Sequence, residues 1–176
     1  YDMGRQLAHE EPVEADLVIG VPDSGLPPAE GYSHESGIPF GEGLIKNRYV
    51  GRTFIEPTQE LRAMGVRMKL NPLRDNIEGK RLVVIDDSIV RGTTSNLITN
   101  LLRDAGAKEV HVKISSPPFV SPCYFGTDVP SNKQLIASSH SVEEICREIG
   151  ADSLGYMPVE DLEEMAGGLP LCTACF

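Results

Sequence analysis

The chain has 176 residues, of which 40% are hydrophobic and 24% charged, a balance that argues against a disordered, collagenous or disulfide-dense protein. Its formal net charge of −10 argues against broad binding to nucleic acid or to an anionic membrane. No apolar run approaches the roughly 20 residues that cross a bilayer, and the start does not have the order of a signal peptide. We therefore expect a cytoplasmic globular protein with one domain.

The first half of the chain predicts two buried strands and a long loop. The β-branched runs at residues 17–21 and 82–85 have the composition of strands buried on both faces, and polar residues follow both. Between them, residues 41–72 contain recurring Gly, Pro, Arg and Lys with weak periodicity, which predicts a strand and a long loop. Loops of that length in compact domains are usually functional or mobile.

The second half predicts helices that alternate with a further strand. Apolar residues recur at helical spacing from Thr93 to a stop at Gly106, and residues 109–114 then alternate as a strand. A second helix begins after Ser141, and residues 159–165 form a third. A strand, a helix and a strand in this order form a parallel, right-handed unit, so the fold class is α/β, with a mostly parallel sheet flanked by helices.

The string from residue 83 to residue 95 carries the clearest chemistry. A strand ends in Asp86 and Asp87, and a loop with Gly92 leads into a helix whose start is rich in hydroxyl groups. Backbone N–H groups at a helix start bind anions, and paired carboxylates hold sugar hydroxyls directly or through Mg²⁺. A phosphorylated sugar fits both features. A loop without a ligand would leave the six small or polar residues between strand and helix unexplained.

This string resembles the phosphoribosyl-pyrophosphate motif of type I phosphoribosyltransferases. A second string, Gly43-Leu-Ile-Lys-Asn-Arg-Tyr-Val-Gly-Arg-Thr-Phe-Ile-Glu-Pro57, resembles a segment of amidophosphoribosyltransferases, as do Val21-Pro-Asp-Ser24, Arg67-Met-Lys-Leu-Asn71 and the cysteine pattern. Together these strings extend the resemblance over nearly the whole chain. It implies the type I phosphoribosyltransferase fold.

The resemblance also implies roles for individual residues. Asp86 and Asp87 would bind the ribose hydroxyls and Mg²⁺, with Ser24 as a further metal ligand. The remaining substrate-binding residues would cradle the 5′-phosphate or adjoin it, and they are Ser88, Arg91, Gly92, Thr93, Thr94 and Ser95. The catalytic loop would supply Lys46 and Lys69 to the pyrophosphate, and Tyr49 and Arg52 to loop closure.

Local charge supports this assignment independently. Residues 44–74 contain seven basic and two acidic residues, a local balance of +5 within an acidic chain. Such a segment can stabilise a departing pyrophosphate, although charge alone is also compatible with a solvated surface loop.

Three of the four cysteines match ligands of a [4Fe–4S] cluster that some amidophosphoribosyltransferases carry: Cys123, Cys172 and Cys175. The fourth ligand of those enzymes lies upstream of the segment that corresponds to Tyr1. Zinc is the rival ligand for this set. Cys146 lies on an apolar helix face with Ile145 and Ile149, which favours a buried structural thiol.

The expected function is transfer of ammonia to phosphoribosyl pyrophosphate, the first committed step of purine synthesis. The resemblance implies that ammonia comes from glutamine in an N-terminal glutaminase domain, that the protein is a homotetramer and that purine nucleotides inhibit it. Residues 1–176 would then be one domain of a longer chain that extends beyond both ends. The alternatives are a non-catalytic sensor of nucleotides or of the sugar substrate, and a type I transferase that uses a base as its nucleophile.

Overall fold

Four parallel strands form the central sheet of the computed structural model, which describes residues 1–49, 69–123, 125 and 131–176. Their order across the sheet is β1, β4, β5, β6. The bounds are Leu17–Gly20 for β1, Arg81–Asp86 for β4, Glu109–Ile114 for β5 and Ser153–Tyr156 for β6. Because the pairs are parallel and β1 ends opposite Ile85, the loops that follow β1 and β4 leave the same edge of the sheet.

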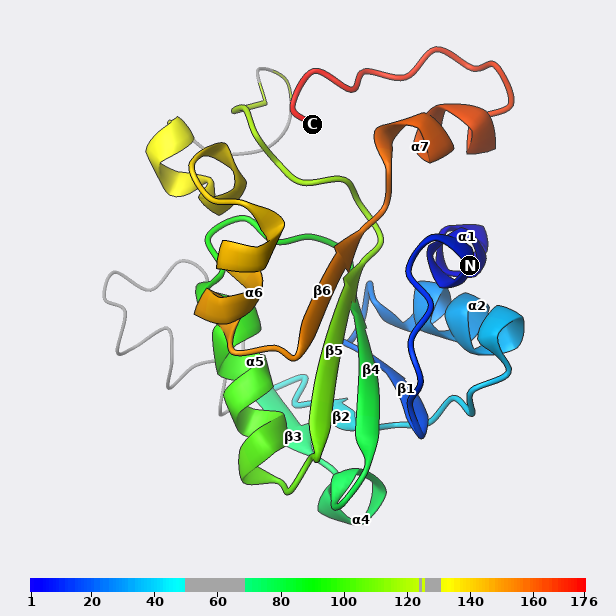
Figure 1. The fold of residues 1–176 in the computed structure, drawn as a ribbon, viewed down its shortest axis with the longest axis vertical. Coiled ribbons are helices and arrows are strands. Elements are labelled where there is room, and N and C mark those ends of the chain that lie inside the picture. Colours follow the sequence, from blue (N-terminus) through cyan, green and yellow to red (C-terminus); the bar gives the residue numbers. More distant parts are fainter. Residues whose placement is uncertain (50–68, 124, 126–130) are drawn as a thin grey trace.

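Helices cover both faces of this sheet (Figure 1). One face carries α5 (Thr93–Asp104) and α6 (Val142–Ile149); the other carries α1 (Asp2–Glu10), α2 (Leu26–Ser36) and α7 (Val159–Met165). Strand side chains alternate between the two layers. Val84 and Val112 belong to the core cluster that includes α5 and α6 residues, whereas Val83 and Ile85 belong to the cluster that includes α1 and α2 residues.

A two-stranded antiparallel hairpin is attached to the β1 side of the molecule. It consists of β2 (Leu44–Lys46) and β3 (Leu70–Pro72), and the short helix α4 (Arg74–Ile77) follows it. Leu44 and Leu70 are buried in the main core cluster, so the base of the hairpin is fixed by packing. Two 3₁₀ turns, η2 (Asn132–Gln134) and η3 (Ile136–Ser138), precede α6.

The ends of α6 show why the sequence begins and stops a helix there. The Ser141 hydroxyl accepts a hydrogen bond from Glu144 N at 3.3 Å, and the Glu144 carboxylate accepts one from Ser141 N at 2.8 Å. This reciprocal capping box satisfies two amides of the first turn. Gly150 follows the helix with φ of +75°, a conformation that costs glycine nothing. The predicted helix is confirmed.

The helices α1 and α2 cross unusually closely. A Cβ atom on Gly4 would lie 1.7 Å from the carbonyl oxygen of Pro28, and one on Gly31 would lie 2.0 Å from that of Tyr1. Glycine at both positions allows the two backbones to touch. Within the described residues, no helix combines the length and apolarity that a membrane span requires.

The expectation for residues 41–72 is only partly confirmed. The predicted strand exists as β2, but residues 70–72 form a second strand that the weak periodicity did not indicate. The residues between 50 and 68 lie outside the described part of the chain.

Candidate active site

The loop after β1 packs directly against the end of β4. Val21 N donates to Ile85 O at 2.8 Å, and Gly25 N donates to Val21 O at 2.9 Å. A Cβ on Gly25 would lie 2.4 Å from Ile85 O, so only glycine permits this turn. The loop that carries the predicted metal ligand Ser24 therefore lies beside the predicted ligands Asp86 and Asp87, at the carboxyl edge where parallel sheets bind ligands.

The predicted carboxylate pair, Asp86 and Asp87, lies at the end of β4. Asp87 N donates to Asp86 Oδ1 at 2.8 Å, and Ser88 Oγ donates to Asp87 Oδ1 at 3.2 Å. Burial, and then the adjacent charge of Asp87, raise the pKa of Asp86 to about 8. A carboxyl group in these surroundings ionises readily only when a positive charge compensates it, so the pair fits a hard divalent cation such as Mg²⁺.

The loop after β4 leads into the helix start that the sequence predicts to bind a phosphate. Gly92 has φ of +76° and immediately precedes α5, whose first helical bond runs from Asn96 N to Gly92 O at 2.9 Å. The amides of residues 93–95 thus precede the hydrogen-bonded turns, and the positive end of the α5 dipole lies behind them. Ile89 is only 2% exposed and anchors the loop in the core. The predicted cradle, Thr93, Thr94 and Ser95, occupies this helix start.

A distant segment holds this cradle in place. Ile136 N donates to Val90 O at 2.9 Å, and the Arg91 guanidinium donates to the Gln134 side-chain oxygen. Gly92 lies so close to η3 that a Cβ on it would be 2.9 Å from Ile136 Cδ1. Sequence reasoning missed Gln134 and Ile136, because no local pattern signals a partner more than 40 residues away.

The hairpin brings cations to the same edge. Lys46, at the end of β2, forms an ion pair with Asp23 in the loop after β1. Asn47 N donates to Lys69 O at 2.7 Å, so Lys69, the residue before β3, lies beside the end of β2. The Lys46 hydrogen bond, together with the charges of Lys46, Arg48 and Lys69, holds the pKa of Asp23 below its usual value. The structure therefore brings Lys46 and Lys69 together at Asp23.

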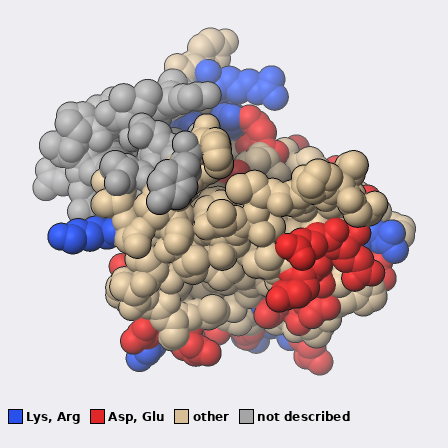
Figure 2. All heavy atoms as spheres, turned by 90° about the horizontal axis from the view of Figure 1, so that it is seen from above, with Lys and Arg blue, Asp and Glu red and all other residues tan. Residues whose placement is uncertain are grey.

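The other two predicted loop residues have different outcomes. The Tyr49 side chain is fully exposed just beyond β2. Arg52 lies outside the described residues. Figure 2 shows one group of Asp and Glu side chains on this face, whereas Lys and Arg side chains lie at several places around its edge.

The three cysteines predicted to bind a cluster lie near one another. Val120 N donates to Cys175 O at 2.9 Å, and the Phe119 and Phe176 rings pack with centroids 4.9 Å apart, so the chain end is held against residues 119–123. Burial raises the pKa of Cys175, and the charges of Cys123 and Cys172 raise it further. The described part of the chain contains no set of three or more His, Cys, Asp or Glu side chains placed around a single metal ion.

Cys146 lies apart from this group. Its thiol donates to Ala151 O at 3.3 Å, and it packs against the main core cluster, as expected for a structural thiol.

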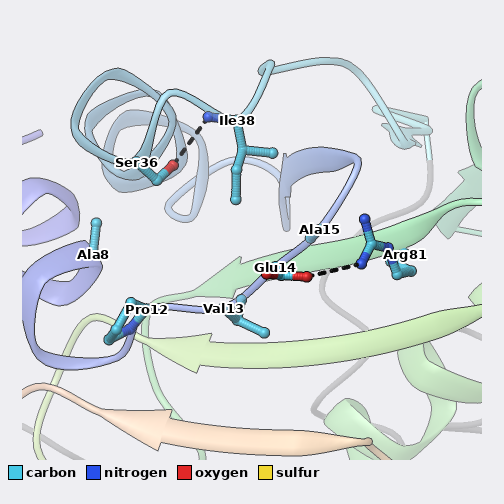
Figure 3. A pocket seen from close by; sticks show the side chains of 8 residues that line it. All are labelled: Ala8, Pro12, Val13, Glu14, Ala15, Ser36, Ile38 and Arg81. Carbon is cyan, nitrogen blue, oxygen red and sulfur yellow. Dashed lines mark hydrogen bonds and ion pairs between the residues drawn. The ribbon is translucent and has the colours of Figure 1, made fainter.

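A pocket of about 390 Å³ lies at the opposite, amino end of the sheet (Figure 3). Its one basic side chain, Arg81, is already paired with Asp16 at 2.9 Å and Glu14 at 3.7 Å. Because this charge is compensated within the protein, the pocket offers no anion site comparable to the one at the carboxyl edge.

Fold and site together define a phosphoribosyltransferase domain. The family model described as phosphoribosyl transferase domain matches residues 6–115, and the chain belongs to this family.

The resemblance to amidophosphoribosyltransferases is also confirmed. The chain is 58% identical to the amidophosphoribosyltransferase of Archaeoglobus fulgidus and 58% identical to that of Bacillus subtilis, over 99% of its own length in each case. It spans 39% and 38% of these relatives. The solved glutamine phosphoribosylpyrophosphate amidotransferase of B. subtilis, complexed with ADP and GMP, superposes with a TM-score of 0.84 at 58% identity, covering 99% of this chain and 38% of that one.

Proposed function

We propose that this chain is the phosphoribosyl-transfer domain of an amidophosphoribosyltransferase and joins ammonia to phosphoribosyl pyrophosphate in the first committed step of purine synthesis. One observation carries the proposal: an anion cradle, a carboxylate pair and a cationic hairpin lie together at the carboxyl edge of the sheet. The similarity to amidophosphoribosyltransferases over 99% of the chain supports it.

Each part of the site has a role in this reaction. The amides and hydroxyls of residues 93–95, with Arg91 and Gly92, hold the 5′-phosphate, and Ser88 supports Asp87. Asp86 and Asp87 bind the ribose hydroxyls. Lys46 and Lys69 stabilise the leaving pyrophosphate, and Tyr49 and Arg52 act in loop closure.

The reaction replaces one bond at the anomeric carbon. The nitrogen lone pair of ammonia forms the C–N bond, and the C–O bond to pyrophosphate breaks with its electron pair on the leaving oxygen. The product ammonium group then loses one proton to solvent. Hairpin cations stabilise charge that develops on the leaving group, and exclusion of water prevents hydrolysis.

A magnesium ion held by Asp86, Asp87 and Ser24 would neutralise the pyrophosphate and orient the ribose. The adjacent carboxylates of Asp86 and Asp87, beside the loop that carries Ser24, support this proposal, because hard divalent cations prefer oxygen ligands.

The rest of the proposed enzyme lies outside this chain. A glutaminase domain would supply ammonia, and the complete protein would assemble as a homotetramer. Purine nucleotides would inhibit by competing for the phosphate cradle; the B. subtilis structure holds ADP and GMP.

The proposal is tested by the rate of pyrophosphate release from phosphoribosyl pyrophosphate by the intact protein, measured against ammonium concentration with Mg²⁺ present. Release that rises with ammonia supports the transferase. Binding of phosphoribosyl pyrophosphate without turnover would favour the sensor, and turnover with a purine or pyrimidine base instead of ammonia would favour a different type I transferase.

We also propose that Cys123, Cys172 and Cys175 bind a [4Fe–4S] cluster in the intact protein, with a fourth ligand outside this chain. Their proximity and the hydrogen bond from Phe125 N to Cys123 Sγ, at 3.4 Å, support this, since N–H···S bonds are typical of cluster sites. Iron and acid-labile sulfide should be found in protein purified without oxygen. Both should be lost in Cys123→Ser and retained in the matched control Cys146→Ser; zinc without sulfide would refute the cluster.

A further inference from the structure

The side chain of Asp23 occupies an unusual position for an exposed carboxylate. It is 61% exposed, yet it pairs with Lys46, and the charges of Arg48 and Lys69 also act on it. These cations come from the hairpin, whereas Asp23 belongs to the loop after β1. The carboxylate thus lies where hairpin cations meet the carboxyl edge of the sheet.

The backbone holds Asp23 in this position independently of its side chain. Asp23 O accepts a hydrogen bond from Leu26 N at 3.3 Å, and Gly25 N donates to Val21 O. A Cβ on Gly20 would lie 2.6 Å from Gly25 O, so the turn is tightly packed. The hairpin likewise has its own attachment through buried Leu44 and Leu70. The ion pair therefore joins two parts that are already fixed.

An ion pair of this exposure contributes little to folding. The main consequence of the ion pair is local, because Asp23 occupies the Lys46 ammonium group that would otherwise be available to another anion. Pyrophosphate carries more negative charge and more acceptor oxygens than one carboxylate, and a second anion beside Asp23 would be repelled. The two anions therefore compete for the same ammonium group.

We propose that Asp23 is an internal counter-ion that occupies the pyrophosphate subsite of the free protein and that pyrophosphate displaces. This inference rests on the proposed phosphoribosyl transfer, which places pyrophosphate at Lys46. Asp23 is then a positioning residue, because it holds Lys46 at the subsite before the substrate binds. Because Asp23 competes for the same ammonium group, it also weakens the affinity of the subsite for pyrophosphate.

The test is the dissociation constant of inorganic pyrophosphate for the intact protein, measured by calorimetry without Mg²⁺ so that Asp23 acts on the anion directly. Asp23→Asn removes the charge but preserves the size, and it should tighten binding about two- to fivefold, the effect of one exposed ion pair. Glu42→Gln is the matched control. Glu42 is also exposed, precedes β2 and uses its backbone oxygen, not its carboxylate, to accept from Asn76; this variant should bind pyrophosphate as the wild type does.

A Lys46→Gln background separates direct competition from a general change in charge. There, Asp23→Asn should gain less affinity than in the wild type, because the shared ammonium group is gone. Equal or weaker pyrophosphate binding by Asp23→Asn, with thermal unfolding unchanged, would overturn the counter-ion role alone. Failure of the wild-type protein to bind pyrophosphate both without and with Mg²⁺ would overturn the proposed function and this inference with it.

Discussion

Gly92→Ala tests how the fold shapes the phosphate cradle. At φ of +76° an L-residue incurs roughly 1–2 kcal/mol of strain, and the new Cβ would lie 2.9 Å from Ile136 Cδ1. Gly79→Ala is the matched control, because Gly79 has φ of +74° with nothing within 4 Å of a Cβ. Both variants should be destabilised by this conformational strain, and Gly92→Ala should be less stable by about 1 kcal/mol more, since the Ile136 side chain has to move.

Urea unfolding measures the free energy of unfolding of each variant, and titration with phosphoribosyl pyrophosphate measures the affinity of each variant for the substrate. Only Gly92→Ala should weaken substrate binding, because its strain arises within the predicted phosphate cradle, at the residue that immediately precedes α5. The reasoning is refuted if both variants lose the same stability and bind substrate as tightly as the wild type.

Three further changes test the scaffold by urea unfolding. Gly4→Ala should cost about 1–3 kcal/mol by forcing α1 away from α2, and an unchanged midpoint would contradict the close contact. Ser141→Ala should cost about 1 kcal/mol by removing the α6 cap, whereas a loss below a few tenths would show that the capping box is unimportant. Arg81 hydrogen bonds hold the pKa of Asp16 at about 2, so this carboxylate stabilises the protein above pH 4 and the contribution is lost as pH falls from 4 through 2. In Asp16→Asn, the free energy of unfolding should fall less steeply between pH 4 and pH 2 than in the wild type. An equally steep fall in both proteins would refute this contribution of Asp16.

Elements whose signals are local could be predicted from the sequence. The β-branched runs gave β1 and β4 to within one residue at each end, and the alternation of residues 109–114 matches β5. Ser141 with Glu144 marks α6 because a capping box needs only four consecutive residues. The carboxylates and the hydroxyl-rich helix start were likewise found because strand, loop and helix are contiguous.

Features that depend on tertiary contacts could not be predicted. The helix α2 contains two prolines in its first turn and Gly31 in its middle, so it has no strong apolar stripe. It exists because Ala29 and Tyr32 pack against the sheet. The strand β6 is short and contains Gly155, which accommodates the Glu11 side chain. The clamp by Gln134 and the Asp23 ion pair join residues separated by 43 and 23 positions, so no local motif signals them.

The central claim is that the carboxyl edge of this sheet transfers a phosphoribosyl group to ammonia. Phosphorus-31 NMR of the intact protein in excess over phosphoribosyl pyrophosphate, with Mg²⁺ and ammonium, tests it most directly. The substrate signals should give way to pyrophosphate and one new phosphomonoester in equal amounts, and Asp86→Asn with Asp87→Asn should abolish the conversion. Substrate signals that persist although the wild-type protein binds the substrate would contradict the claim.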